Sequence, residues 1–300
     1  MRQTRMVASL LELRGIASEI VKVKTKGDRK RDKPHEGPVP AGLFTHEIEV
    51  GLAKKKVDCA VHSLKDLPLE LRTGLSIAAV LEREDPRDVL VVNSVTGAED
   101  IASLPAGSRV GTSSARRRAQ LLTHRRDIEP VELRGSVPER LRKVERGMVH
   151  AAILSADSLI RLGASTRITQ YLDAPGWLPA VGQGAVVIEI RTDDSEMRDI
   201  VAPLDHNLTS IATRAERAFL SALEGAPQMP VAAVAIPDSA DRLTLHAFVS
   251  DPAGRDPVRG SIAVDMEFPD ESGRALFAEM GTRGLSSLLL ELRNADKFQA

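Results

Sequence analysis

Three times between residues 109 and 162, a short apolar run ends in a glycine, serine or threonine turn that leads into a helical pattern. The expected helices cover 115–123, 138–146 and 157–162. This alternation is typical of an α/β fold with parallel strands, whose ends and following helix starts share one edge of the sheet. Backbone N–H groups and the helix dipole favour anions at that edge, although such turns also cap helices without any ligand.

The same segment carries a local excess of basic side chains. Between residues 109 and 146 there are eleven Arg or Lys and five Asp or Glu, although the whole chain has a net charge of only −1. Arginine forks pair with carboxylates in a fixed orientation, so the segment favours recognition of a small anion. The alternative is a solvated helix face with ion pairs. Aromatic residues make up only 3% of the chain, and nucleic acid is therefore not expected.

The remaining patterns predict two further blocks. In the first, strands are expected at 19–25, 57–62 and 75–81, with a helix over 47–55. The chain is expected to enter a second lobe near Asp85, resume a strand at 89–92, and return to the first sheet through the apolar strand 185–191. The last block predicts a small α+β domain. Its expected elements are helix 210–223, strands 231–236, 243–250 and 261–267, and helix 271–292 interrupted at Gly281 and Gly284.

A chain of 300 residues is longer than one hydrophobic core usually organises, which predicts several domains. We expect a first lobe formed by 1–84 and 185–203, an arginine-rich second lobe formed by 85–184, and a C-terminal domain formed by 204–300. The single cysteine, Cys59, excludes an internal disulfide and a thiolate metal site. No apolar run reaches the length of a membrane span, and Met1 to Gly15 lacks a signal sequence. We therefore expect a cytoplasmic monomer that binds neither metal, membrane nor nucleic acid.

Five motifs in order across nearly the whole chain resemble those of the porphobilinogen deaminase (hydroxymethylbilane synthase) family. They are Val61-His62-Ser63-Leu64-Lys65-Asp66-Leu67-Pro68, Glu84-Asp85-Pro86-Arg87-Asp88, Gly111-Thr112-Ser113-Ser114-Ala115-Arg116-Arg117, Leu133-Arg134-Gly135-Ser136-Val137, and Leu178-Pro179-Ala180-Val181-Gly182-Gln183-Gly184-Ala185.

The resemblance implies two lobes like those of type II periplasmic binding proteins, with mixed, mainly parallel sheets, and a small α+β C-terminal domain. It also implies the reaction, in which four porphobilinogen units of tetrapyrrole and heme biosynthesis are joined head to tail with release of ammonia. The implied partners are porphobilinogen and the growing polycarboxylate pyrrole chains. The implied cofactor is dipyrromethane.

Residue roles follow from the same resemblance. Asp66 is implied as the catalytic carboxylate that stabilises positively charged pyrrole intermediates, and Lys65 as a partner of a substrate carboxylate. The other substrate- or cofactor-binding positions are Ser63, Thr112, Ser113, Ser114, Arg116, Arg117, Arg134, Arg140, Arg161 and Gln183. Without the resemblance, a Lys-Asp pair after a strand is more typical of an ordinary turn than of a catalytic site. His62 is expected to be a packed or hydrogen-bonded residue.

The sequence departs from the family pattern at three places. Pro227 occupies the position of the cysteine to which the family attaches dipyrromethane, and proline has no nucleophile, so no covalent attachment is expected there. Cys59 is not an obvious substitute because its apolar strand predicts a small buried thiol. Ala41 stands where the family usually has lysine. Finally, Met1 aligns inside the first family helix, so we expect either an upstream start or a first lobe that lacks a central strand.

Two hypotheses of different classes follow. The first is an active deaminase, or an enzyme of closely related pyrrole condensation, that holds its dipyrromethane primer noncovalently, supported by Asp66, Lys65 and the arginines. The second is a noncatalytic descendant that binds porphobilinogen or a tetrapyrrole as carrier, sensor or partner subunit, supported by the loss of the cysteine and of the expected N-terminal strand. A periplasmic solute receptor is a distant third.

Overall fold

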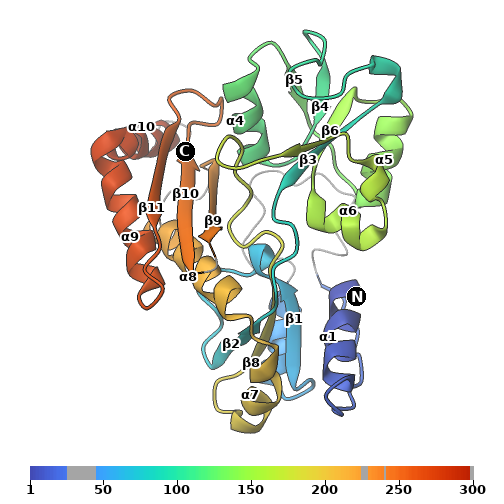
Figure 1. Ribbon diagram of the computed structural model, residues 1–300, viewed down its shortest axis with the longest axis vertical. Helices are drawn as coiled ribbons and strands as arrows, with labels where there is room; N and C mark the ends of the chain where they lie inside the picture. Colours follow the sequence, from blue (N-terminus) through green and yellow to red (C-terminus); the bar gives the residue numbers. More distant parts are fainter. Residues whose placement is uncertain (26–44, 224–228, 240, 298–300) are drawn as a thin grey trace. The chain divides into compact units, whose positions relative to one another are not determined.

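The computed structural model describes residues 1–25, 45–223, 229–239 and 241–297 (Figure 1). The chain divides into two compact units. Unit 1 consists of Met1–Glu84 and Gly182–Ile211, and unit 2 consists of Asp85–Val181 and Ala212–Ala300. Most of the residues expected to form the second lobe, 85–181, and most of those expected to form the C-terminal domain thus fall in one unit, whereas residues 182–184 belong to unit 1.

Unit 1 is built on a three-stranded antiparallel sheet with the order β1-β8-β2. Its strands are β1 (Cys59–Ser63), β8 (Val186–Arg191) and β2 (Leu75–Val80). The predicted return of an apolar strand to the first sheet is confirmed, because β8 pairs with β1 on one side and β2 on the other. A central strand is covered on both faces, which explains its nearly continuous apolar run.

Helices cover both faces of this sheet. Ile188 and Ile190 of β8 lie in a buried cluster with residues of α1 (Arg2–Glu12) and α7 (Ser195–Val201). Val187 faces the other way, into a cluster with Leu64, and α3 (His46–Ala53) packs on the sheet through Leu52. Alternation along the strand therefore divides the core of unit 1 into two layers.

The strand predicted over residues 19–25 is wrong. The described residues 16–25 carry no strand assignment and pair with no other described strand. Alternating side chains make a segment suitable for a sheet, but a strand also requires a neighbour that supplies its backbone hydrogen bonds.

Unit 2 contains a five-stranded sheet with the order β5-β4-β6-β3-β7. Its strands are β5 (Glu129–Val131), β4 (Arg109–Gly111), β6 (Ala151–Ser155), β3 (Asp88–Val92) and β7 (Gln170–Leu172). The three predicted strand-to-helix junctions are confirmed: β4 leads to α4 (Ala115–His124), β5 to α5 (Val137–Glu145) and β6 to α6 (Ala156–Leu162).

The strands β5, β4 and β6 are parallel, so their three junctions share one edge, as predicted. The sheets are mixed, but parallel pairing in the described part of the chain is limited to these three strands, and every other pair is antiparallel. The family-based expectation of mainly parallel sheets is corrected accordingly. Asp88, at the start of β3, pairs with Ser155, at the end of β6, so β3 begins at the junction edge and runs away from it.

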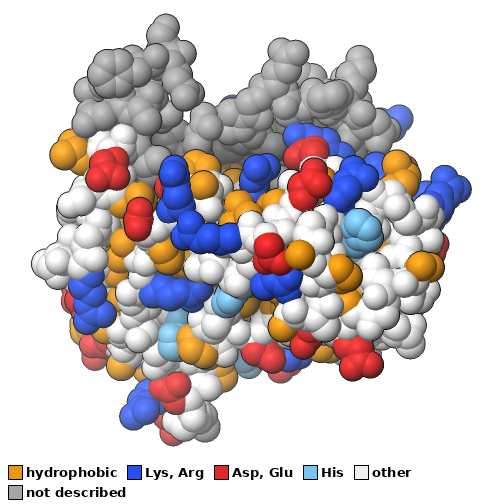
Figure 2. Space-filling model, turned by 90° about the horizontal axis from the view of Figure 1, so that it is seen from above, with side chains coloured by type: hydrophobic (Ala, Val, Ile, Leu, Met, Phe, Trp, Pro, Cys, Tyr) orange, Lys and Arg blue, Asp and Glu red, His pale blue; other side chains and the backbone are white. Residues whose placement is uncertain are grey.

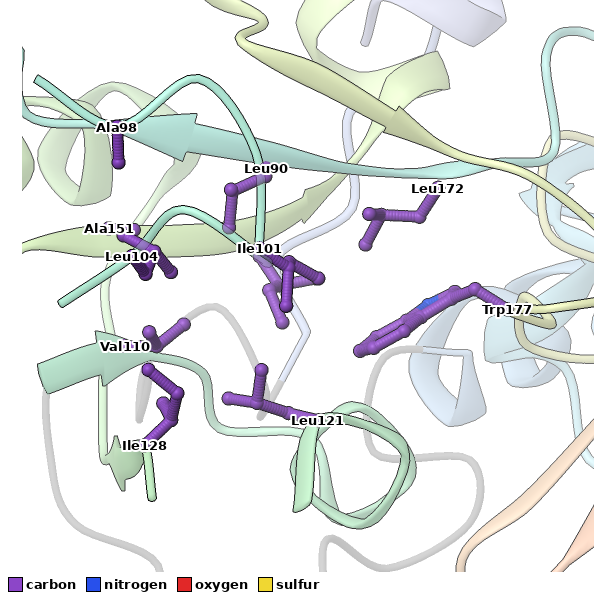
Figure 3. Packing of buried hydrophobic residues seen from close by; sticks show 11 residues of the cluster. Leu90, Ala98, Ile101, Leu104, Val110, Leu121, Ile128, Ala151, Leu172 and Trp177 are labelled. Carbon is purple, nitrogen blue, oxygen red and sulfur yellow. The ribbon is translucent and has the colours of Figure 1, made fainter. Parts of the chain in front are cut away.

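Buried side chains fill both faces of this five-stranded sheet. Figure 3 shows one layer, in which Leu90, Val110 and Leu121 pack with Trp177. The opposite layer contains Val89 and Val91 of β3 with residues of α5 and α6. The adjacent strand residues Leu90 and Val91 enter different layers, as the two-residue period of a strand requires.

The last part of the chain forms the predicted α+β arrangement. Helix α8 (Asn207–Ala222) is followed by an antiparallel sheet of order β11-β10-β9 and then by helices. The remaining elements are β9 (Val231–Ser239), β10 (Arg242–Val249), β11 (Val258–Ala263), α9 (Pro269–Met280), η5 (Gly281–Leu285) and α10 (Ser286–Lys297). The predicted helix interruption is confirmed at Gly284, whose φ of +110° breaks the helix. The short helical turns elsewhere are η1 (Leu64–Asp66), η2 (Ser94–Thr96), η3 (Ser165–Arg167) and η4 (Ala202–Leu204).

Candidate active site

The predicted catalytic carboxylate lies in η1, the turn that follows β1 in unit 1. Leu64 anchors this turn because its side chain is only 2% exposed and its backbone N–H donates to the carbonyl of Ala185 at 3.0 Å. Gly182 packs against it: a Cβ at this glycine, which has a φ of +70°, would lie 2.8 Å from Leu64 Cγ. The turn is thereby fixed on its buried side, while Lys65 is half-buried and Asp66 is exposed.

Two further predicted residues of unit 1, Ser63 and Gln183, lie next to residues of this turn or next to Gly182, which packs against it. Ser63 ends β1, and its hydroxyl accepts a hydrogen bond of 2.7 Å from the side-chain amide of Gln3 in α1. Gln183 is only 1% exposed, and its backbone carbonyl oxygen accepts a hydrogen bond from Arg83 Nε at 2.9 Å. Burial limits what the Gln183 side chain offers to a ligand, whereas Ser63 is half-buried.

His62 is a buried, hydrogen-bonded residue, as predicted. Its Nε2 lies 3.1 Å from Oε2 of Glu189 in β8, and the two residues are 5% and 0% exposed. The other oxygen of Glu189, Oε1, is buried without a hydrogen-bond partner among the described residues. Sequence reasoning missed Glu189, although a single acidic residue inside the apolar run Val186–Arg191 is an identifiable signal, because buried charges require partners.

In unit 2, the turn after β4 begins the junction edge. Thr112 is 6% exposed, and its hydroxyl accepts from the backbone N–H of Ser114 at 3.2 Å. Ser114 is the N-cap of α4, with its hydroxyl accepting from the backbone N–H of Arg117 at 3.4 Å. Ser113 is exposed. Of the three predicted hydroxyl residues, Thr112 and Ser114 thus organise the turn, and Ser113 faces solvent.

The first turn of α4 carries Arg116 and Arg117, which are only 7% and 8% exposed. Both bind Asp88, the first residue of β3. Arg116 Nη1 lies 2.6 Å from Asp88 Oδ2, and Arg117 donates to Oδ1 from Nε at 3.1 Å and from Nη2 at 2.8 Å. Burial alone would raise the pKa of Asp88, but the two guanidinium groups outweigh burial and hold this pKa well below its usual range.

Backbone carbonyls and one indole complete this cluster. Arg116 Nη1 also donates to the carbonyl of Leu178 at 2.7 Å, and Arg117 Nη1 donates to that of Ile153 at 3.2 Å. Trp177 donates its indole N–H to Asp88 Oδ2 at 2.8 Å. The two arginines are therefore fixed in position by groups from three separate parts of unit 2.

The other predicted arginines have partners close to them in sequence. Arg134 lies 2.5 Å from Glu132, Arg140 donates to the carbonyl of Gly135 at 2.8 Å, and Arg161 pairs with Asp157 one helical turn earlier. In Figure 2, acidic side chains lie among the Lys and Arg side chains of the face that is shown. The expected alternative of ion-paired helix faces thus describes part of the arginine set.

Cys59 is partly buried at the start of β1, where it packs against the cluster that contains Ile188. Burial raises the pKa of its thiol, and the neighbouring Asp58 raises it further, against a smaller opposing effect of Arg191. A raised pKa lowers the fraction of thiolate, the nucleophilic form. Pro227 and Ala41 lie outside the described residues.

In the described ranges, no three His, Cys, Asp or Glu side chains are grouped so that they could hold a metal ion. Among helices of that same part of the chain, none is both long and apolar enough to cross a membrane.

Sequence reasoning also missed Asp88 as an organising residue. It ends the motif Glu84-Asp85-Pro86-Arg87-Asp88, and an aspartate directly before an apolar strand resembles a residue of an ordinary turn. Its burial at 0% exposure and its three side-chain donors become apparent only when β3, α4 and the segment around Trp177 are brought together.

Comparison with known proteins gives a consistent result over the chain. A family model described as "Porphobilinogen deaminase, dipyromethane cofactor binding domain" matches residues 1–199, and one described as "Porphobilinogen deaminase, C-terminal domain" matches residues 210–281. A porphobilinogen deaminase of Moorella thermoacetica is 42% identical to this chain, covering 99% of it and 95% of the relative. One of Syntrophobacter fumaroxidans is 43% identical, covering 94% and 90%.

Among solved structures, the VFT2 domain of Bordetella pertussis BvgS, determined as a double mutant, is similar over 73% of this chain and 82% of that one. The sequence identity is 19% and the TM-score is 0.40.

Proposed function

The chain belongs to the porphobilinogen deaminase family, and we propose that it is a transferase that joins four porphobilinogen units head to tail to form hydroxymethylbilane, with release of ammonia. The observation that carries this proposal is the match to both family domains and to relatives more than 40% identical over nearly the whole chain. Retention of Asp66 and of the predicted arginines supports it.

Asp66 is the catalytic carboxylate in this proposal. The buried anchor Leu64 fixes the turn that carries it, so the carboxylate is held without itself being buried. A positioned carboxylate stabilises positive charge as it develops on the pyrrole and can accept a pyrrole N–H proton. Lys65, the preceding residue, supplies a positive charge for a substrate carboxylate.

The arginine-rich edge of unit 2 binds the acidic side chains of the substrate and product. Each porphobilinogen brings two carboxylates, and the parallel strands β5, β4 and β6 place their junctions on one edge. Ser113 faces solvent in the first junction, and Arg134 and Arg140 follow the second. Guanidinium groups on a rigid edge recognise several carboxylates at once with defined orientation.

The dipyrromethane expected from the family fits this chain only in part. The arginines suit its carboxylates, but a covalent link has no suitable nucleophile: Pro227 cannot supply one, and Cys59, the only cysteine, is partly buried with a raised pKa. We therefore propose that Arg116, Arg117 and the neighbouring hydroxyl residues hold the group noncovalently. When bound, dipyrromethane supplies the pyrrole carbon onto which the chain grows.

The proposal is tested by incubating the purified protein with porphobilinogen and measuring ammonia release together with uroporphyrin fluorescence after acidification and oxidation. The Asp66→Asn variant is expected to lose at least about a hundredfold in turnover, because proton handling and charge stabilisation by a positioned group are worth that much. Asp58→Asn is the matched control in the same unit. Its side chain is 77% exposed, so its turnover should stay within about twofold.

One specific observation favours a second function, a noncatalytic protein that binds porphobilinogen or a tetrapyrrole. It is the proline at the position where the family attaches its cofactor. Absence of turnover from porphobilinogen, even after addition of hydroxymethylbilane as a primer, together with measurable binding, would establish this function instead. Intact-mass measurement is expected to show the unmodified chain, and a dipyrrole adduct on Cys59 would contradict noncovalent binding.

A further inference from the structure

Asp88 is the buried side chain around which Arg116 and Arg117 are arranged at the junction edge of unit 2. Its carboxylate is 0% exposed and accepts hydrogen bonds from Arg116, Arg117 and Trp177. Asp88 also lies at this junction edge, because it pairs with Ser155 at the point where β6 ends. A single buried acceptor thus joins the start of α4, the start of β3 and the segment that carries the indole.

The charges in this cluster do not cancel. Among the described residues, two guanidinium groups meet one carboxylate, and the other hydrogen bonds of the two arginine side chains go to neutral backbone carbonyls. An uncompensated charge in a largely dehydrated site is costly unless an anion joins it. Arg116 and Arg117 are 7% and 8% exposed, so a small part of each residue remains accessible to such an anion.

The contacts with Asp88 also fix the directions of the two forks. Arg117 uses Nε and Nη2 on the carboxylate and Nη1 on a carbonyl, so its planar group cannot turn without breaking several hydrogen bonds. Arg116 is held by the carboxylate and by a carbonyl at 2.6 and 2.7 Å. A binding site becomes selective when buried side chains behind the ligand-binding groups hold those groups in one orientation.

We propose that Asp88 is a positioning residue for carboxylate recognition: it holds Arg116 and Arg117 as one oriented pair with a single net positive charge, which binds one carboxylate of the pyrrole substrate or chain. This inference rests on the proposed function, since it names how that same site recognises its ligand. Asp88 itself touches neither the ligand nor the reacting atoms.

The test compares Asp88→Asn with Asp127→Asn. Both variants remove one negative charge in unit 2 that is paired with arginine, but Asp127 has a side chain that is 44% exposed. With porphobilinogen as substrate, Asp88→Asn is expected to raise KM about tenfold or more, while kcat changes by less than about threefold. Asp127→Asn is expected to leave both constants within about twofold.

The direction of the change in KM distinguishes orientation from charge alone. Asp88→Asn raises the net charge of the cluster, so a site governed only by charge would bind the anionic substrate more tightly. A lower or unchanged KM would therefore overturn the proposal. A fall in kcat with no change in KM would overturn it as well, because that pattern assigns Asp88 to the chemical step.

Trp177 provides a measurement that does not depend on turnover. It is the only tryptophan of the chain, and its indole N–H binds the same carboxylate. Titration of the wild-type protein with porphobilinogen is expected to change the tryptophan fluorescence, and Asp88→Asn is expected to shift the midpoint at least about tenfold upwards. If wild-type protein binds but does not turn over, the proposed function fails, and this shift still decides the role of Asp88.

A second variant covers the case in which Asp88→Asn does not fold. Trp177→Phe keeps all three charges and removes one donor to Asp88, so the carboxylate is held less firmly. It is expected to raise KM by about threefold or more with kcat retained. A KM equal to that of the wild type in this variant would overturn the positioning role.

Discussion

A methyl group added at Gly111 would test how tightly the junction edge of unit 2 is packed. Gly111 ends β4, and a Cβ there would lie 2.6 Å from Cδ2 of Leu133 and 2.9 Å from its Cβ. A rotation of the Leu133 side chain can move Cδ2 but not Cβ. The backbone at Leu133 must therefore shift by several tenths of an ångström before the contact becomes an ordinary one.

Leu133 has little room for that shift, because it is 3% exposed and packs in the layer that contains Val89 and Val91. Inserting a methyl group into a well-packed core costs about 1–3 kcal/mol. We expect Gly111→Ala to lower the free energy of unfolding of unit 2 by that amount. Because Arg134 follows Leu133 directly, the same shift is expected to weaken binding of porphobilinogen.

The assay is urea-induced unfolding followed by the fluorescence of Trp177, which lies in the buried core of unit 2 with Val110. Gly176→Ala is the matched control in the same unit. The nearest atom to a Cβ at Gly176 is the carbonyl oxygen of Asp173 at 3.5 Å, an ordinary contact. This variant should unfold within about 0.5 kcal/mol of the wild type.

Two results would refute the reasoning. If Gly111→Ala unfolds within about 0.5 kcal/mol of the wild type, the packing around Leu133 is looser than the distances indicate. If Gly176→Ala loses as much stability as Gly111→Ala, the effect comes from glycine replacement in general and not from the contact between β4 and Leu133.

Three further outcomes are expected. For the buried pair His62 and Glu189, we expect Glu189→Leu alone to lower the free energy of unfolding by about 1–3 kcal/mol, because it leaves the histidine without its partner. The double variant His62→Leu/Glu189→Leu should recover most of that loss in urea unfolding, and no recovery would contradict a paired role. Because the pKa of Asp88 is depressed in the folded state, its carboxylate stabilises the fold above about pH 4, and this stability is lost as the pH falls further. Between pH 5 and pH 3, the free energy of urea unfolding should therefore fall more steeply for the wild type than for Asp88→Asn, and parallel curves would contradict this. Cys59→Ser should keep its turnover within about twofold, since we propose that the cofactor is not attached to this partly buried thiol. A complete loss of ammonia release would contradict that proposal.

The sequence predicted the βα part of unit 2 because each element there carries its own signal. The run Ala151–Ser155 is apolar and ends at a helix start, so neighbouring residues alone indicate the change from strand to helix. The short strand Gln170–Leu172 went unrecognised because three residues are too few to show a period. The segment 19–25 shows the opposite error: its side chains alternate as in a strand, but it pairs with no described strand.

The candidate site shows the same division between local and distant information. The N-cap of α4 could be predicted because Ser114 and Arg117 lie three residues apart. The cluster around Asp88 could not, because Arg116 is 28 residues away from Asp88 along the chain and Trp177 is 89 residues away. No spacing rule links these positions, and only the packing of β3 against the start of α4 brings their charges together.

Counting charges from the sequence therefore overstates what the arginine-rich segment offers to a ligand. Arg125 is bound to Asp127 and to backbone carbonyls, and Arg134 is bound to Glu132, so much of the local excess is used within the fold. What distinguishes Arg116 and Arg117 is that two guanidinium groups share one carboxylate. In our proposal, positive charge therefore remains where little water reaches it, and the contacts that hold the two guanidinium groups set the direction from which a carboxylate approaches.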